Sequence, residues 1–145
     1  MRVFAVSDIH VDYAENLDWI LSLDAREFSE DVLILAGDVT DKMPLLRQVF
    51  DSLVACFKAV LFVPGNHELW VQDEDFDCSL TKFDAITELC KFCGVHADIF
   101  EMPDISFVPL FSWYDFSFGE PDRHLRRAWR DFRACSWPDH LSGAR

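Results

Sequence analysis

Three short apolar segments near the start of the chain each end in a polar cluster. The clusters are Asp8-Ile9-His10, Gly37-Asp38 and Gly65-Asn66-His67-Glu68. A strand buried in a parallel sheet has no structural need for a carboxylate or an imidazole at its carboxyl end, which is where such folds place their active sites. Three endings of this kind predict one shared polar centre, and their donor groups are typical of a metal site.

The apolar segments cover residues 3–6, 32–36 and 60–63. Short, continuously apolar segments rich in β-branched residues are typical of parallel strands buried on both faces. Helical spacing separates them, with one predicted face made of Leu17, Ile20, Leu21 and Phe28 and a second made of Met43, Leu46, Val49, Phe50, Leu53, Val54 and Phe57. Asp41 and Pro44 predict the start of the second helix. We therefore expect an α/β fold that begins with a parallel βαβαβ unit, whose right-handed crossovers bring the three carboxyl ends to one edge.

The later part of the chain continues the alternation. A third helix is predicted over residues 80–93, closed by Gly94, and two strands over residues 99–102 and 105–111. A fourth helical pattern places Leu125, Ala128, Trp129 and Phe132 on one face. The aromatic segment 113–118 fits either a substrate cleft or packing under that helix. Without a repeat, a low-complexity tract or a linker, residues 1–145 are predicted to form a single domain.

Charge and cysteine usage limit the class of protein. The net charge of −13 argues against general binding to nucleic-acid backbones, because only local basic patches or bound cations would offset the repulsion from phosphate. The first apolar segment is too short for a secretory leader or a membrane span, and the five cysteines are an odd number. We therefore expect a cytoplasmic protein with reduced thiols and no membrane association.

The first two clusters carry ligands for a transition metal. In an extended segment, residues two apart point the same way, so Asp8 and His10 can reach one cation together. Mixed oxygen and nitrogen ligands suit Zn, Mn or Fe better than Ca. Asp38 follows the second strand, where its carboxylate can bridge two ions, and Gly37 lets the backbone turn beside it.

The third cluster adds a neutral ligand and a candidate acid. The amide oxygen of Asn66 can bind a metal, and His67 can donate a proton to a leaving alkoxide or hold a phosphoryl oxygen. Two interpretations of Glu68 remain open, one in which it orients His67 and one in which it is a solvated turn residue.

Taken in order, the three clusters resemble the first three motifs of the calcineurin-like metallophosphoesterases, a match that covers residues 1–68. The resemblance implies a four-layer α/β/β/α sandwich, present here in part, and hydrolysis of phosphomonoesters or phosphodiesters by a metal-bound hydroxide. It implies that Asp8 and His10 bind a first divalent ion, with Mn, Fe or Zn as candidates. It further implies that Asp38 bridges to a second ion held by Asn66. His67 would then be the catalytic residue that assists the leaving group of the phosphoester substrate.

Family members also carry an isolated histidine and a later Gly-His-x-His motif. The later histidines here are His96, His124 and His140, and none of them follows a glycine. By this analogy the second ion keeps only Asp38 and Asn66, so we expect one ion where the complete site holds two. We also expect a truncated amino-terminal part of such an enzyme, with impaired activity. The face of the sheet that the missing half would cover would then invite self-association.

Two other patterns fit structural roles better than functional ones. Cys90-x-x-Cys93 near His96 has zinc-like spacing, but both cysteines fall on the apolar face of a predicted helix, which favours core packing. Five arginines interleaved with Asp122 and Asp131 favour a solvated, salt-bridged helix face over a binding stripe; they are Arg123, Arg126, Arg127, Arg130 and Arg133. The alternative to a phosphoesterase is a non-catalytic metal-binding or interaction protein derived from such an enzyme.

Overall fold

A parallel sheet forms the centre of the molecule. The computed structural model describes residues 1–72, 76–112, 119 and 123–138. The sheet contains β1 (Val3–Val6), β2 (Val32–Leu35) and β3 (Ala59–Phe62), in the order β1-β2-β3. All neighbouring strands are parallel, with Val3 paired to Val32 and Val32 paired to Ala59. The predicted βαβαβ unit is confirmed.

Four helices connect or follow these strands: α1 (Ala14–Leu21), α2 (Ala25–Phe28), α3 (Met43–Cys56) and α4 (Ser79–Cys93). The first predicted helix is in fact two, because the Asp24 side chain accepts a hydrogen bond from the Arg26 amide and starts α2. Leu21 is 44% exposed, so its prediction as part of the apolar face is wrong. The second predicted helix begins at Met43, after Lys42 rather than Asp41.

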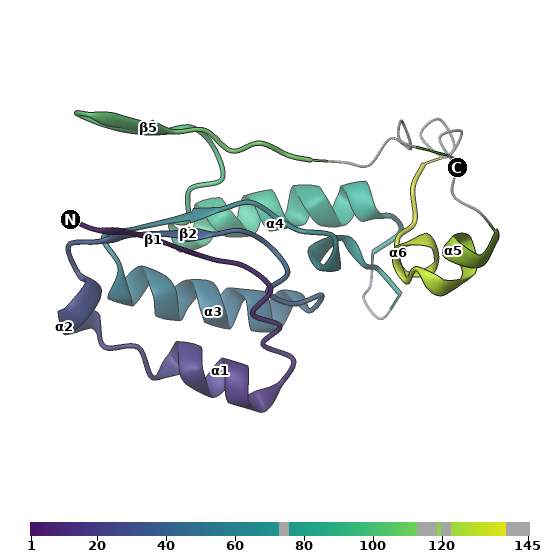
Figure 1. Cartoon of the computed structure of the whole chain (residues 1–145), viewed down its shortest axis with the longest axis horizontal. Helices are drawn as coiled ribbons and strands as arrows, with labels where there is room; N and C mark the ends of the chain where they lie inside the picture. The colour runs from purple at the N-terminus through teal and green to yellow at the C-terminus, as the bar shows by residue number, and fades with distance from the viewer. Residues whose placement is uncertain (73–75, 113–118, 120–122, 139–145) are drawn as a thin grey trace.

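The main core lies between the sheet and these helices (Figure 1). Leu46, Val49, Phe50 and Leu53 of α3 and Ile86 of α4 pack against the strand side chains Leu33, Leu35, Val60 and Phe62. Cys90 is buried in the same cluster, and the half-buried Cys93 packs against it. Cys90 and Cys93 therefore serve core packing, as predicted. Gly94 ends α4 in the left-handed conformation, also as predicted.

The opposite face of the sheet is covered by an antiparallel hairpin of β4 (Phe100–Met102) and β5 (Ile105–Phe107). Side chains of the hairpin pack on Val32, Ala59 and Leu61, all buried. The expectation of a bare sheet face is therefore wrong for β2 and β3, and self-association stays a prediction without that support. The hairpin forms part of a second sheet layer, whereas the complete four-layer sandwich stays a prediction.

Strand β1 differs from its neighbours. It lies at an edge of the sheet, and Val3 is 43% exposed, so the prediction that all three strands are buried on both faces holds only for β2 and β3. The other edge is extended by backbone hydrogen bonds from Phe62 to His96 and from His96 to Val60. At this edge, His96 pairs with β3 as a single-residue bridge.

The last described segment lies at the carboxyl end of the strands (Figure 1). It contains α5 (Arg123–Ala128) and α6 (Asp131–Ala134), so the fourth predicted helix is divided, and Trp129 between them is 50% exposed rather than on a buried face. The aromatic segment 113–118 and His140 lie outside the described residues. No helix in the described part of the chain has the length and apolar character that crossing a membrane requires.

Candidate metal centre

The loops after β1 and β2 run side by side at the carboxyl edge of the sheet. The Asp8 amide donates to the Gly37 carbonyl at 3.1 Å, and the His10 amide donates to the Asp38 carbonyl at 3.1 Å. Strand pairing thus continues in the loops, past the last regular residues of β1 and β2. As a result, the first two polar clusters are brought together, as their positions after parallel strands predict.

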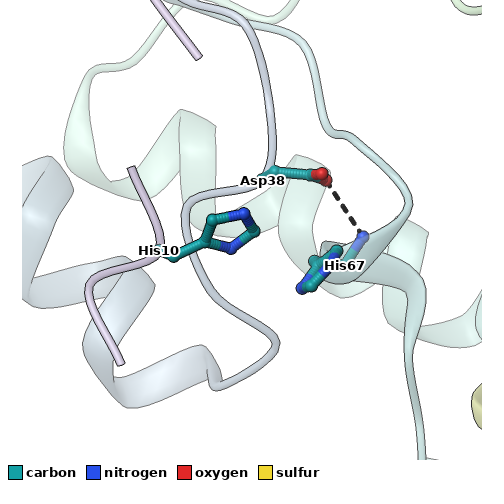
Figure 2. A group of neighbouring side chains, drawn as sticks. All are labelled: His10, Asp38 and His67. Carbon is teal, nitrogen blue, oxygen red and sulfur yellow. Dashed lines mark hydrogen bonds between the residues drawn. The ribbon is translucent and has the colours of Figure 1, made fainter. Parts of the chain in front are cut away.

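Three side chains converge at this edge (Figure 2). His10, Asp38 and His67 each offer one ligand atom, and these atoms lie within 4.8 Å of one another. His67 belongs to the short 3-10 helix η1 (His67–Leu69), and its backbone amide donates to Asp38 Oδ1 at 3.2 Å. Imidazole nitrogen and carboxylate oxygen are suitable donors for Zn, Mn or Fe, so the group fits a divalent ion.

The backbone of the first two clusters is unusual. Asp8, His10 and Asp38 have φ angles of +55°, +42° and +54°, a region that residues other than glycine seldom adopt. The premise of an extended Asp8 to His10 segment is therefore wrong. Asp8 is exposed and is not one of the three converging residues, so its role as a ligand stays a prediction. Such conformations cost stability and persist where the surroundings hold them, typically at functional sites.

Two glycines allow the second and third loops to touch. Gly37 has a φ of +76°, and a Cβ atom on it would lie 2.5 Å from the Gly65 nitrogen. A Cβ atom on Gly65 would lie 2.2 Å from Asp38 Oδ1. Any larger side chain would therefore push the Asp38 carboxylate away from its place beside His67.

Glu68 binds the loops together from below the surface. Its side chain is fully buried, with Oε1 accepting from the amides of Val39 (2.6 Å) and Thr40 (3.2 Å). Oε2 accepts from the amides of Asp38 (3.0 Å) and Gly65 (2.6 Å). Burial raises the pKa of the Glu68 carboxyl, and these four amide donors oppose the rise. The interpretation of Glu68 as a solvated turn residue is therefore wrong. Glu68 joins the loops after β2 and β3, a role that neither interpretation included.

The environment of His67 favours a neutral imidazole. Burial lowers the pKa of His67, the neighbouring Asp38 opposes this change, and His10 adds to it. The His67 ring also lies against the Trp70 indole, with ring centroids 3.7 Å apart. A half-buried neutral imidazole can bind a metal through one nitrogen or donate a hydrogen bond through the other.

Asn66 points to a residue that the sequence patterns did not single out as functional. Its Nδ2 donates to Asp131 Oδ1 at 2.9 Å, and Asp131 is only 4% exposed. The placement of Asp131 on a solvated arginine face is therefore wrong. Asp131 is followed by no glycine turn and follows no strand, so local sequence contains no signal for this role. The Arg130 guanidinium lies over the Trp70 ring at 4.3 Å, which places this end of the arginine stripe beside the same loop.

The chain is similar in sequence and in structure to known proteins. A family model described as calcineurin-like phosphoesterase matches residues 1–137. The chain is 32% identical over 125 residues to the acyl-carrier-protein phosphodiesterase PptH of Mycobacterium tuberculosis, a match that covers 80% of this chain and 38% of that protein. The crystal structure of phosphopantetheinyl hydrolase (PptH) from Mycobacterium tuberculosis is similar with a TM-score of 0.79 at 25% identity, covering 99% of this chain and 59% of that one. The chain thus spans less than two thirds of the length of these relatives.

Proposed function

The chain belongs to the calcineurin-like phosphoesterase family, and we propose that it is a metal-dependent hydrolase of phosphodiesters. The observation that carries the proposal is the convergence of His10, Asp38 and His67 at the carboxyl edge of the sheet. The preference for diesters over monoesters is supported by the phosphodiesterase name of the relative from Mycobacterium tuberculosis.

We propose that Asp8, His10 and Asp38 hold one divalent ion and that Asp38 and Asn66 contribute to a second position. Members of this family use divalent metals, and the donor set of the converging residues fits such an ion. When bound, these ions supply Lewis-acid chemistry that lowers the pKa of water and offsets charge on the phosphoryl oxygens. The choice among Mn, Fe and Zn is part of the test below.

The chain itself contributes orientation and a hydrogen-bond donor. The Glu68 carboxylate fixes the loops that present Asp38 and His67, so these groups need no rearrangement when the substrate enters. A neutral His67 imidazole retains one N–H, which can donate to the leaving oxygen of the ester. We therefore propose His67 as the catalytic residue that assists the departure of the alcohol.

Asp38→Asn tests this proposal. Hydrolysis of bis(p-nitrophenyl) phosphate with saturating Mn²⁺ should fall by at least about 100-fold, because the variant loses a charged ligand. A matched control is Asp51→Asn on α3, where the exposed carboxylate contacts Arg47 and the Cys93 thiol and is not part of the converging group. This control should keep the wild-type rate. Loading the metal-free protein with Mn²⁺, Fe²⁺ or Zn²⁺ in parallel identifies the ion that supports turnover.

Three outcomes would count against the proposal. Wild-type protein with no turnover above the Asp38→Asn variant would remove the hydrolase function. If that protein still bound Mn²⁺, the non-catalytic metal-binding alternative would replace it. Faster hydrolysis of p-nitrophenyl phosphate than of the diester would refute the preference for diesters.

A further inference from the structure

We infer that Asp131 is a positioning residue of the metal centre, which orients the Asn66 amide and holds Trp70 beside His67. The inference rests on the proposed function, because Asn66 is a proposed ligand. Asp131 begins α6, and Asn66 lies 65 residues earlier in the chain. The contact therefore joins the last described segment to the loop after β3.

The direction of the hydrogen bond determines which atom of Asn66 is left for a cation. An ionised carboxylate only accepts hydrogen bonds, so Asn66 must turn its NH₂ group toward Asp131. The amide oxygen is then on the other branch, away from Asp131, where it is available to a cation. We expect that, with no acceptor at position 131, this contact no longer fixes which branch of the Asn66 amide faces it, and an NH₂ group turned the other way cannot bind a metal.

The same oxygen of Asp131 also fixes an aromatic neighbour of the site. Asp131 Oδ1 accepts from Trp70 Nε1 at 2.7 Å, and the Trp70 ring lies against the His67 ring at an interplanar angle of 32°. Trp70 is buried, so its indole N–H needs a partner inside the protein. One carboxylate oxygen thereby sets the position of a proposed ligand and, through Trp70, of the proposed catalytic histidine.

The surroundings of Asp131 are built to hold it in place. Its other oxygen, Oδ2, accepts from Trp129 Nε1 at 2.8 Å. Backbone hydrogen bonds from Val71 to Ala134 (2.8 Å) and from Ser79 to Ser136 (2.7 Å) hold the segment against the loop after η1 and the first residue of α4. Burying a carboxylate is costly unless several donors satisfy it, and an apolar residue at this place would avoid that cost. A buried carboxylate that accepts a hydrogen bond from a proposed ligand fits the outer partners that orient metal ligands in other proteins.

The test measures Mn²⁺ binding, without any substrate, to the Asp131→Ala variant, which removes the oxygen that accepts from Asn66 and Trp70. We expect the dissociation constant to rise about 10-fold or more, the usual effect of losing such an outer partner. Trp129→Phe is the matched control, because it removes a donor from Oδ2 and leaves both bonds to Oδ1 in place. Its dissociation constant should stay within about 3-fold of wild type, which is below the range for outer partners.

A second measurement separates positioning from general structure. In the metal-free ¹⁵N-labelled protein, the side-chain amide protons of Asn66 should exchange slowly in wild type and Trp129→Phe, and quickly in Asp131→Ala. Backbone signals of β1, β2 and β3 should be the same in all three proteins. Loss of those signals in Asp131→Ala would mean that Asp131 is a folding residue, and would overturn the inference.

Unchanged Mn²⁺ affinity in Asp131→Ala would also overturn it, as would an equal loss in Trp129→Phe. These failures are distinct from failure of the proposed function. If the wild-type chain does not hydrolyse the diester but Asp131→Ala weakens Mn²⁺ binding, the hydrolase is refuted and the positioning role is upheld. If the wild-type chain hydrolyses the diester and Asp131→Ala binds Mn²⁺ normally, the hydrolase is upheld and the positioning role is refuted.

Discussion

The two ends of the parallel sheet are held in opposite ways. At the amino end, before β1 and β2, the guanidinium of Arg2 donates from Nε (2.9 Å) and Nη2 (2.6 Å) to Asp31 Oδ2. This end has ordinary backbone geometry and one ion pair. At the carboxyl end, Asp8, His10 and Asp38 have positive φ angles, and two glycines leave room for the loops to touch.

The two ends differ in how much backbone strain they contain. The ion pair at the amino end joins neighbouring strands without forcing either backbone. Each positive φ angle at the carboxyl end costs about 1 kcal/mol or more, and buried amides there depend on one carboxylate, that of Glu68. The amino end therefore only stabilises the pairing of neighbouring strands, whereas the carboxyl end is strained so that polar groups converge.

The largest expected effect is removal of the Glu68 carboxylate. Glu68→Ala leaves four backbone amides without their acceptor, so the free energy of unfolding should fall by at least about 3 kcal/mol. Urea unfolding of the metal-free protein measures this change. Glu15→Ala, on the exposed surface of α1, is the control and should change stability by less than about 0.5 kcal/mol. If Glu68→Ala lowered the free energy of unfolding as little as Glu15→Ala does, the carboxyl end would not depend on Glu68.

A methyl group on Gly65 should have the next largest effect. Its Cβ would collide with the Asp38 carboxylate, which predicts a loss of about 2 to 3 kcal/mol in unfolding free energy and weaker Mn²⁺ binding. Gly94→Ala is the matched control, because Gly94 has a φ of +79° but no atom within 4 Å of an added Cβ. That control should lose about 1 kcal/mol and bind Mn²⁺ normally. Calorimetric titration with Mn²⁺ beside urea unfolding distinguishes the two, and normal Mn²⁺ binding by Gly65→Ala would contradict the close packing.

The smallest effect is expected at the amino end. The Arg2 guanidinium lowers the pKa of the Asp31 carboxyl and burial opposes it, so the folded-state pKa lies below the unfolded value of about 3.9. The stabilisation is therefore present above that value and is lost as the pH falls through the folded-state pKa. Asp31→Asn should lower the urea midpoint at pH 7, and its difference from wild type should shrink on acidification. Mn²⁺ affinity at pH 7 should not change, and a change there would mean that the two ends are coupled.

Local patterns predicted the sheet and the main helices well. Strands β2 and β3 are continuous apolar runs, and α3 and α4 have clear helical spacing, so composition alone determines their type. Edges and ends were predicted less well. Val3 is apolar but lies on an edge strand. Asp24 starts a new helix inside the segment that the apolar spacing predicted as a single helix. Such outcomes depend on neighbours in space or on a single cap.

The candidate site divides in the same way. The meeting of His10, Asp38 and His67 follows from parallel strands that end at one edge, which the sequence order implies. The roles of Glu68 and Asp131 do not follow, because each depends on which backbone amides or side chains surround a buried carboxylate. A lone acidic residue gives the same local signal whether it is solvated or buried. The ligand roles of Asp8 and Asn66 stay predictions.

The long separation between Asn66 and Asp131 has a consequence during protein synthesis. A ribosome adding about 5 to 20 residues per second needs roughly 3 to 13 s to travel the 65 residues between them. During that interval the nascent chain already carries His10, Asp38 and His67 but lacks the partner of Asn66. On the proposed ligand role of Asn66, a newly made chain meets cellular metal ions before this amide has a fixed orientation, which makes the order of translation a factor in which ion is first captured.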